Sequence, residues 1–395
     1  MHAHMTRRTA LLGLASAISV GRTSLAMAAA PTDRRFVVII LRGALDGLSA
    51  LVPYGDPALS GLRGALVPPL PGREGGMGDL GGFFGLHPAL PGLHALYREG
   101  QVLPIHAVAG PVRTRSHFEA QDLMESGAEQ RMSSGWLNRA VQTMPSRPGA
   151  GVPLSIGVAL PLLMRGHAAV GAYAPPSFGQ PQADLYAKLV AMHQADPITG
   201  PALRQGLAER GFTTAQLAGF TPEPGQRNSF FTLAGTAGRL MAAPDGPRVA
   251  AMELGGWDTH TGQAQRLTGQ LKQLDDGIVA LKAGLGAAWA NTVVMVMTEF
   301  GRTVHVNGTG GTDHGTGAAA FLAGGAVSGG RVIATWPGLS PTQLLERRDL
   351  QPTIDLRSVA KGVLAGHFGL APAALNQAFP NSQGAPPLLG LVRAA

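Results

Sequence analysis

Residues 248–300 read RVAAMELGGWDTHTGQAQRLTGQLKQLDDGIVALKAGLGAAWANTVVMVMTEF. The apolar runs Arg248–Met252 and Thr292–Met297 are typical of strands that are buried on both faces. Between them, apolar residues recur at spacings of three and four, which predicts an amphipathic helix carrying Leu267, Leu271, Leu274, Ile278, Leu281 and Leu285. Because a strand–helix–strand crossover in one sheet joins parallel strands, almost always with a right hand, this stretch predicts a parallel sheet.

Other apolar runs extend the same pattern along the chain. Arg35–Leu41 and Val102–Val108 are also predicted to be buried strands, and helices are expected over Ala183–Ala195, Asn228–Ala243 and Thr353–Phe368. Alternating strands and helices predict an α/β fold, with a mostly parallel sheet and helices on both of its faces. With 45% apolar and 14% charged residues, we expect one domain over residues 31–395, with a helical excursion near residues 183–243.

Residues 1–30 have the layout of a removable export signal. Residues 6–12 read TRRTALL, a twin-arginine pattern, and an apolar segment and small residues for cleavage follow. An amphipathic anchor or short membrane helix is the alternative, but the apolar segment Ala10–Val20 is shorter than the roughly 18 residues that a spanning helix needs. We therefore expect a twin-arginine signal peptide, the twin-arginine translocase as a partner, and a periplasmic or secreted product without stable membrane insertion.

Charge and composition narrow the class of partner and cofactor. The formal net charge is +7, but three arginines lie in residues 1–30, and the other basic residues are scattered, so no nucleic-acid partner is expected. The glycine-rich stretches at 308–311 and 324–325 lack the spacing of a phosphate-binding loop, so no nucleotide cofactor is expected. Because the chain has no cysteine, any metal must be held by Asp, Glu, His or hydroxyl groups.

Three acidic residues follow predicted buried strands. They are Asp46, Asp258 and Glu299. Because the carboxyl ends of parallel strands lie on one edge of a sheet, we expect these carboxylates to converge there. Clustered carboxylates repel one another unless a cation or a proton lies between them. For Asp46 a helix N-cap is an open alternative.

Two histidines add nitrogen ligands near these acids. Asp258 and His260 lie two residues apart, on the same side of an extended segment, and Asp313-His314 lies in a glycine-rich turn. Each histidine could instead be a surface or hydrogen-bonded imidazole. We predict one pocket that binds a divalent Zn, Mn, Mg or Ca ion through Asp46, Asp258, His260, Glu299, Asp313 and His314.

Ser116 is the candidate nucleophile. It lies after a predicted strand, beside Arg115, at the start of an expected helix, where an alcohol can approach a phosphoryl or sulfuryl centre. Ser116 and Glu119 also match the capping-box pattern S-x-x-E, which accounts for both residues without catalysis. Guanidinium groups bind phosphate or sulfate well, so substrate binding, or else ion pairing with Asp46 or Glu299, is expected of Arg42, Arg115 and Arg302.

The chain resembles an exported family known as domain of unknown function 1501. Besides the twin-arginine start, the resemblance rests on residues 41–47 (LRGALDG), 116–121 (SHFEAQ), 255–260 (GGWDTH), 298–303 (TEFGRT) and 311–315 (GTDHG). That family is regarded as a remote branch of the alkaline phosphatase and sulfatase superfamily. The resemblance implies a doubly wound α/β sandwich around a central, mostly parallel sheet.

The resemblance also implies roles for individual residues. Ser116 resembles the superfamily's alcohol nucleophile, and its metal-binding residues are matched by Asp46, Asp258, His260, Glu299 and His314. The chain departs from the two-zinc pattern at two places, because Asp258 and His260 are spaced D-x-H rather than D-x-x-x-H and Phe300 stands where a histidine is usual. A mononuclear site, a different metal or no metal are therefore all consistent with the sequence.

Two functions from different classes follow from these observations. The first is an exported metal-dependent hydrolase of a phosphate or sulfate ester, whose substrate would be a small molecule or a glycan ester. The second is a non-catalytic envelope protein that uses the same edge of the fold to bind a partner or a glycan.

Overall fold

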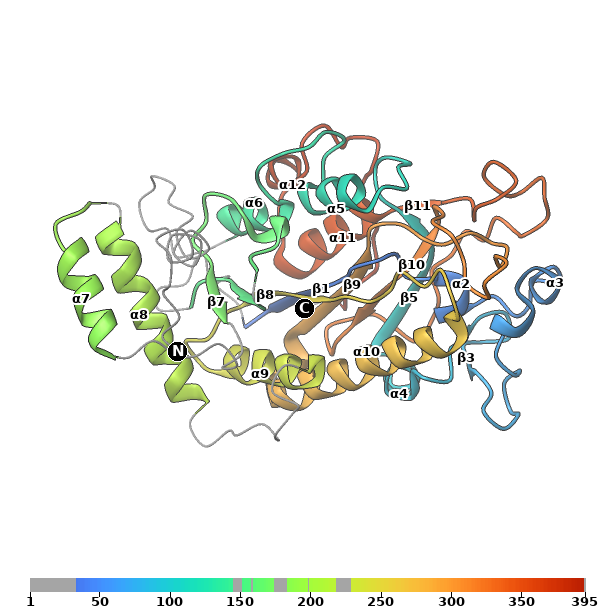
Figure 1. Ribbon diagram of the computed structural model, residues 1–395, viewed down its shortest axis with the longest axis horizontal. Helices are drawn as coiled ribbons and strands as arrows, with labels where there is room; N and C mark the ends of the chain where they lie inside the picture. The colour runs from blue at the N-terminus through green and yellow to red at the C-terminus, as the bar shows by residue number, and fades with distance from the viewer. Residues whose placement is uncertain are drawn as a thin grey trace, which may run out of the picture.

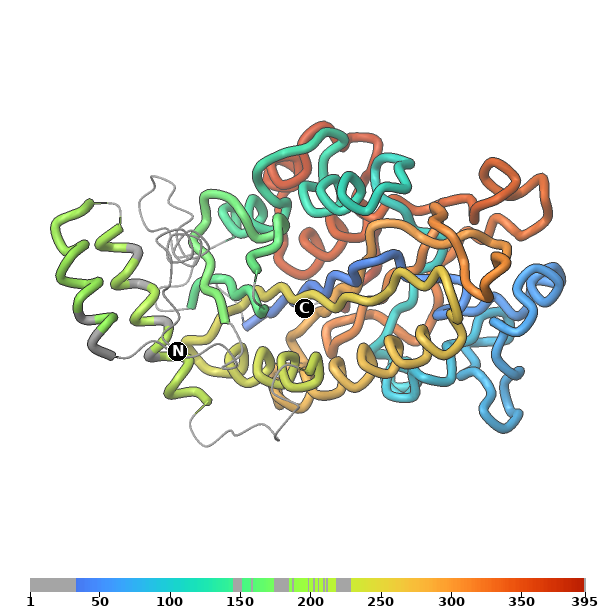
Figure 2. Tube along the Cα trace, viewed as in Figure 1, coloured from blue at the N-terminus to red at the C-terminus, as the bar shows by residue number. Residues whose placement is uncertain are grey.

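A computed structural model describes residues 33–144, 151–157, 159–173, 183–197, 199–217 and 229–393, which Figure 1 draws in colour, and Figure 2 traces the same backbone. The predicted signal peptide lies outside the described residues. Within them, no helix is long and apolar enough to cross a membrane.

The centre of the fold is an eight-stranded sheet in the order β11-β5-β10-β9-β1-β8-β6-β7 (Figure 1). Its strands are β1 (Arg35–Leu41), β5 (Val102–Ala109), β6 (Leu154–Ile156), β7 (Gly171–Tyr173), β8 (Val249–Leu254), β9 (Thr292–Thr298), β10 (Ala318–Ala323) and β11 (Ile354–Asp355). Every pair of neighbours is parallel except the two pairs that include β10. The predicted mixed α/β class with a mostly parallel sheet is confirmed.

The stretch that predicted the fold forms the unit β8–α10–β9. Helix α10 (Gln263–Leu285) joins strands that both pair in parallel with β1, which lies between them. All six apolar residues of the predicted stripe are buried. Alternate side chains of β1 point to opposite faces of the sheet, and both sets are apolar: Val37 and Ile39 belong to one hydrophobic cluster, and Phe36 and Val38 belong to the other. Both faces of the sheet must therefore be covered.

Helices cover both faces of the sheet (Figure 1). One layer contains α4 (Pro91–Arg98), α9 (Phe230–Ala242) and α10, and the other contains α5 (His117–Ser126), α6 (Trp136–Thr143), α11 (Leu356–Phe368) and α12 (Pro372–Ala378). Glycines let α9 and α10 approach closely: a Cβ added at Gly238 would lie 2.6 Å from the Leu281 carbonyl oxygen. A methyl group there would force the two helices apart.

The remaining elements lie outside these two layers. Helices α7 (Ala183–His193) and α8 (Thr199–Gln216) stand beside the sheet as a hairpin, where the helical excursion was predicted (Figure 1). A second sheet has the order β2-β4-β3, and its neighbourhood includes α2 (Gly47–Ala50), β2 (Leu51–Val52), α3 (Leu59–Arg63), β3 (Gly78–Asp79) and β4 (Gly85–Leu86). Short 3-10 helices cover Gly64–Leu66, Leu162–Met164 and Gly286–Asn291.

One predicted helix boundary was wrong. The helix expected over Thr353–Phe368 begins only at Leu356, because Ile354 and Asp355 pair with β5 as the edge strand β11. The Asp355 carboxylate then accepts a hydrogen bond from the Arg357 N–H and caps the helix. A period of 3.6 residues does not reveal a two-residue strand that depends on a partner far along the chain.

Two buried histidines make the fold sensitive to acid. The pKa of His106 and the pKa of His367 are each lowered to about 4, because burial disfavours the imidazolium. In the unfolded chain these rings bind protons near pH 6.5, so the unfolded state binds more protons between that pH and about 4. We expect the free energy of unfolding to be undiminished above pH 6.5 and to fall by about 2 to 3 kcal/mol per ring as the pH drops toward 4.

Urea unfolding at pH 7.5, 6 and 4.5, with a chelator present, would measure this loss. In the His367→Gln variant the amide can still donate to the Arg35 carbonyl, as the ring does at 3.0 Å, but cannot titrate. This variant should lose correspondingly less stability on acidification. An unfolding free energy that stays constant over this pH range would rule out the neutral buried rings.

Candidate metal centre

The site lies at the carboxyl edge of the sheet, where several chain segments meet. Strands β1, β5, β8 and β9 end at this edge, and the antiparallel strand β10 begins there. The loop after β8 therefore brings Asp258 and His260 to the same place as His117, at the start of α5, and His314, just before β10. The topology places these residues together although they are far apart in the sequence.

Three imidazoles converge through the same ring atom. The Nε2 atom of His314 lies 3.0 Å from Nε2 of His117 and 3.0 Å from Nε2 of His260. The Asp258 carboxylate joins them, with Oδ1 3.1 Å from Nε2 of His260 and 3.2 Å from Nε2 of His314. Its Oδ2 lies 3.6 Å from Nε2 of His117. The result is a cluster of three nitrogen atoms and one carboxylate.

The other nitrogen of each ring is held by an oxygen acceptor. Nδ1 of His117 donates to Glu299 at 2.8 Å, and Nδ1 of His260 donates to Asp313 at 3.1 Å. The third ring, His314, donates from Nδ1 to the carbonyl oxygen of Arg115 at 2.9 Å. Because carboxylate and carbonyl oxygens only accept, each Nδ1 carries a hydrogen, and a ring in its neutral form turns an Nε2 lone pair toward the cluster.

This arrangement fits a bound divalent cation. Lone pairs that face one another at 3.0 Å, beside a carboxylate, repel unless a cation or a proton lies between them. Imidazole nitrogens with one carboxylate oxygen are a common donor set for zinc and suit other divalent transition metals. Carboxylate or carbonyl acceptors on the opposite ring nitrogens are typical of metal-binding histidines, since they fix the tautomer and the ring orientation.

Buried groups around the cluster hold its acids in the charged form. Burial opposes the charge on Glu299, but hydrogen bonds from His117 and Gln121 outweigh this effect and lower the pKa of the carboxyl group. The Gly43 N–H also donates to Glu299, at 2.8 Å. For Asp258, burial is likewise outweighed, by Arg302, and the pKa is lowered.

The pKa values of His117 and His314 are shifted in opposite directions. The hydrogen bond to Glu299 raises the pKa of His117, whereas burial lowers the pKa of His314. Phe300 packs against both rings, with centroid distances of 4.9 Å to His117 and 5.1 Å to His314. The residue that departs from the superfamily pattern therefore provides an apolar wall beside the imidazoles.

The structure distributes the predicted metal ligands over different roles. Asp258, His260 and His314 contribute atoms to the cluster, whereas Glu299 and Asp313 hold the outer nitrogens of two rings. Asp46 takes the alternative role of a helix N-cap, because its carboxylate accepts from the Leu48 N–H at 3.1 Å. Asp46 is also in a buried ion pair with Arg63, and its Oδ2 accepts from Ser49 and Gln263 as well.

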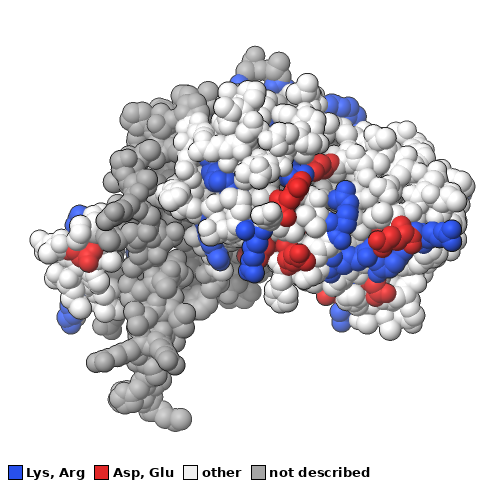
Figure 3. All heavy atoms as spheres, turned by 90° about the horizontal axis from the view of Figure 1, so that it is seen from above, with Lys and Arg blue, Asp and Glu red and all other residues white. Residues whose placement is uncertain are grey.

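The three predicted substrate-binding arginines all have acidic partners. Arg42 pairs with Glu125 and Glu253, and Arg115 pairs with Asp349 and Glu346. The guanidinium of Arg302 is buried and donates to Asp258 at 2.7 Å. The alternative of ion pairing is therefore what the structure shows, although with partners other than those expected. Basic and acidic side chains also lie next to one another on the face in Figure 3.

Ser116 begins α5, but it does not form the predicted capping box. It occupies the N-cap position with no hydrogen bond from its side chain to the helix. Instead, Thr114 donates its hydroxyl to the Glu119 carboxylate at 2.7 Å. Ser116 is exposed, and its neighbours in the chain are Arg115, whose carbonyl accepts from His314, and the cluster residue His117.

His117 is the site residue that we did not predict. In the sequence it follows a candidate helix cap, and a histidine at a helix start is usually an exposed residue. The one hint in the sequence was that His117 directly follows Ser116, the candidate nucleophile, which would bring the histidine close to the proposed site. Only the fold shows that this ring reaches both Glu299 and His314.

Comparison with known proteins places the chain in a family. The family model described as "Protein of unknown function (DUF1501)" matches residues 94–378, which is more than half of the chain. The chain belongs to this family. No curated protein matches its sequence.

Several solved structures are similar to the chain at low identity. They include Ps i-CgsB in complex with k-i-k-neocarrahexaose, with a TM-score of 0.41, 9% identity, and coverage of 90% of this chain and 77% of that one. The alkaline phosphatase from the Antarctic bacterium TAB5 has a TM-score of 0.35 and 12% identity, with coverage of 73% and 90%. The phosphonate monoester hydrolase of Agrobacterium radiobacter has a TM-score of 0.32 and 12% identity, with coverage of 76% and 70%. At 9–12% identity, these structures do not assign a reaction to this chain.

Proposed function

We propose that the protein is a metal-dependent hydrolase of a phosphate or sulfate ester. The observation that carries this proposal is the convergence of three Nε2 atoms and the Asp258 carboxylate, with each opposite ring nitrogen held by an acceptor. His117, His314 and Asp258 would hold the metal, and His260 flanks them, with its Nε2 3.0 Å from that of His314. When bound, a divalent cation would polarise an ester oxygen and lower the pKa of a neighbouring hydroxyl group or water.

We propose Ser116 as the nucleophile. Its exposed hydroxyl makes no hydrogen bond to the helix that it begins, and the next residue belongs to the cluster. Attack by the Ser116 oxygen would form a bond to phosphorus or sulfur and break the bond from that atom to the ester oxygen, and the proton lost by the serine hydroxyl would balance the proton gained by the leaving alcohol. Water would then release phosphate or sulfate from the serine.

The first turn of α5 is a candidate oxyanion site in place of the three arginines. Among the described residues, the backbone N–H groups of His117, Phe118 and Glu119 have no hydrogen-bond acceptor, because the Ser116 side chain does not cap them. Free N–H groups and the helix dipole favour a negative group at this position. An ester oxygen that approaches Ser116 would lie beside both these N–H groups and the metal site.

We further propose a single metal ion. The Asp46 carboxylate, which the superfamily resemblance assigned to a metal, is neutralised by the guanidinium of Arg63. Glu299 and Asp313 are engaged by ring nitrogens. The remaining donors whose ligand atoms all lie within 4.8 Å of one another are His117, Asp258 and His314. With one water molecule, these three ligands match one tetrahedral ion.

Elemental analysis and an ester screen test this function together. Protein exported by its native host should retain about one equivalent of a divalent metal after dialysis. It should hydrolyse at least one ester in a panel of nitrophenyl phosphates, nitrophenyl sulfates and sulfated or phosphorylated glycans. Retained metal without turnover of any ester would favour the non-catalytic partner-binding or glycan-binding protein. Protein that binds none of zinc, manganese, magnesium or calcium would refute the proposal.

Export by the twin-arginine route is a separate proposal, based on Arg7 and Arg8. Replacing both with lysine should strand the full-length precursor in the cytoplasm, because this route requires the arginine pair. Fractionation and immunoblotting would show the location and the size of the product. Arg22→Lys, which changes an arginine outside the motif, is the matched control. Normal processing of the double variant would contradict this route.

A further inference from the structure

A closed ring of hydrogen-bonded groups lies behind the metal ligand Asp258. We call it the buried ring, and it consists of the side chains of Arg302, Thr312, Gln263, Asp46 and Arg63 with the carbonyl group of Thr303. All five residues are buried, each no more than 1% exposed. Every side-chain nitrogen and oxygen atom of these five residues has a hydrogen-bond partner except Nε of Arg63, and buried networks of this kind are rigid.

The first part of the ring connects Asp258 to α10. Arg302 donates from Nη1 to Oδ1 of Asp258 at 2.7 Å and from Nε to the Thr312 hydroxyl at 3.2 Å. The Thr312 hydroxyl in turn donates to Oε1 of Gln263 at 2.6 Å. Thr312 therefore holds the guanidinium in the orientation that points Nη1 at the metal ligand.

The second part of the ring returns through Asp46. Gln263 donates from Nε2 to the Asp46 carboxylate, and so does Nη2 of Arg63. Nη1 of Arg63 donates to the Thr303 carbonyl at 2.9 Å. Because Thr303 directly follows Arg302, this last bond closes the ring.

Hydrogen-bond donation in the ring starts at the two guanidinium groups and ends at the Asp46 carboxylate and the Thr303 carbonyl. The two guanidinium groups only donate and the Asp46 carboxylate only accepts, so the amide of Gln263 can be oriented in one way. Its nitrogen must face Asp46 and its oxygen must face Thr312. Two cations, Arg63 and Arg302, balance the two anions Asp46 and Asp258. Loss of any one member would leave a buried partner unsatisfied.

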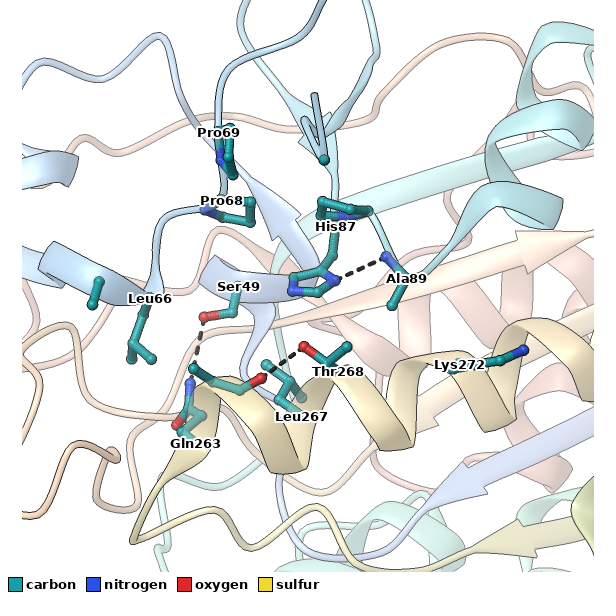
Figure 4. A pocket seen from close by; sticks show the side chains of 14 residues that line it. Ser49, Leu66, Pro68, Pro69, His87, Ala89, Gln263, Leu267, Thr268 and Lys272 are labelled. Carbon is teal, nitrogen blue, oxygen red and sulfur yellow. Dashed lines mark hydrogen bonds between the residues drawn. The ribbon is translucent and has the colours of Figure 1, made fainter. Parts of the chain in front are cut away.

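The far side of the ring opens on a cavity of about 470 Å³. Figure 4 shows Ser49 and Gln263 at this cavity, joined by a hydrogen bond. The Ser49 hydroxyl also donates to Asp46 at 3.0 Å. Gln263 thus has the cavity on one side and, through Thr312 and Arg302, Asp258 on the other. The path from Asp46 to the metal ligand runs through these side chains and not through the imidazoles.

We infer that Asp46 is a positioning residue, which acts on the metal site through Gln263, Thr312 and Arg302. It orients the Asp258 carboxylate toward the imidazoles without contacting the metal itself. This inference rests on the proposed metal site. It predicts that breaking the ring at a distance from Asp258 weakens metal binding, while the cluster residues stay unchanged.

The test is the zinc dissociation constant, measured by competition with a chromophoric chelator on folded, metal-free protein. Thr312→Val keeps the shape of the side chain and removes the hydroxyl between Arg302 and Gln263, so it should weaken zinc binding about 10-fold or more. Thr312→Ser, which restores the hydroxyl, should return the affinity to near the wild-type value. Asp46→Asn should weaken binding about 10- to 100-fold. Since both changes break the same ring, the double variant should lose little more than Asp46→Asn alone.

Asp275→Asn is the control for a general loss of stability. The Asp275 carboxylate is buried and accepts from the Gly92 and Leu93 N–H groups, at 2.9 and 2.7 Å, at the start of α4. This variant should be destabilised but should bind zinc like the wild type. Wild-type affinity in Thr312→Val would overturn the inference, and so would an equal loss in Asp275→Asn. A wild-type protein that binds no metal would overturn the proposed function and this inference with it.

Discussion

Replacing His314 with alanine is expected to lower the metal affinity at least about 100-fold, because a tetrahedral metal site draws roughly 3 kcal/mol or more from each ligand. His314 is the central ring of the cluster, with Nε2 3.0 Å from the corresponding atom of both other imidazoles. The affinity would be measured by competition with a chelator and the stoichiometry by elemental analysis.

The metal-free protein should respond differently to the same change. Without a cation, the three Nε2 lone pairs repel one another, so removing one ring should not lower the unfolding free energy of the metal-free form. Only the metal-bound form should become less stable. His94→Ala, which alters a half-buried histidine bonded to the Asp79 carbonyl, is the matched control and should retain metal. Wild-type metal retention in His314→Ala would show that the cluster is not a metal site.

Replacing Ser116 with alanine should abolish ester hydrolysis, with a loss of at least about 1,000-fold in turnover, if the screen finds a substrate. Because the Ser116 side chain makes no hydrogen bond to α5, the same change should alter the unfolding free energy by less than about 0.5 kcal/mol. The activity loss can therefore be separated from any effect on folding. Steady-state kinetics and urea unfolding of the same preparation would measure both quantities.

A second variant at this position separates nucleophilic attack from helix capping. Ser116→Asp can accept hydrogen bonds from the free N–H groups of the first turn and should stabilise α5 by up to about 1 kcal/mol. It should still lack activity, because a carboxylate cannot replace the alcohol. Turnover in either variant within about 10-fold of the wild type would shift the chemistry to a water molecule held at the cluster.

The roles of the acidic and basic residues illustrate where prediction from sequence ends. An acid after a buried strand could be placed at the carboxyl edge of the sheet from topology alone, and Asp46, Asp258 and Glu299 do follow strands that end there. Which cation each acid contacts could not be predicted. Asp46 meets Arg63, only 17 residues away, whereas Arg42 meets Glu125 and Glu253 instead of Asp46. These partners depend on how loops pack, which leaves no periodic signal.

The sequence by itself determined the architecture, because the signals for strands and amphipathic helices are local. The unbroken apolar run of β1 and the stripe along α10 require burial on particular faces, and a crossover between β8 and β9 has essentially one arrangement. Only the tertiary structure decided which side chains contact one another at the carboxyl edge of the sheet. His117 lies in the cluster, the Ser116 side chain makes no hydrogen bond to α5, and Asp46 belongs to the buried ring. Such contacts depend on distances of a few ångströms between loops from separate parts of the chain, and residue spacing along a sequence does not encode them.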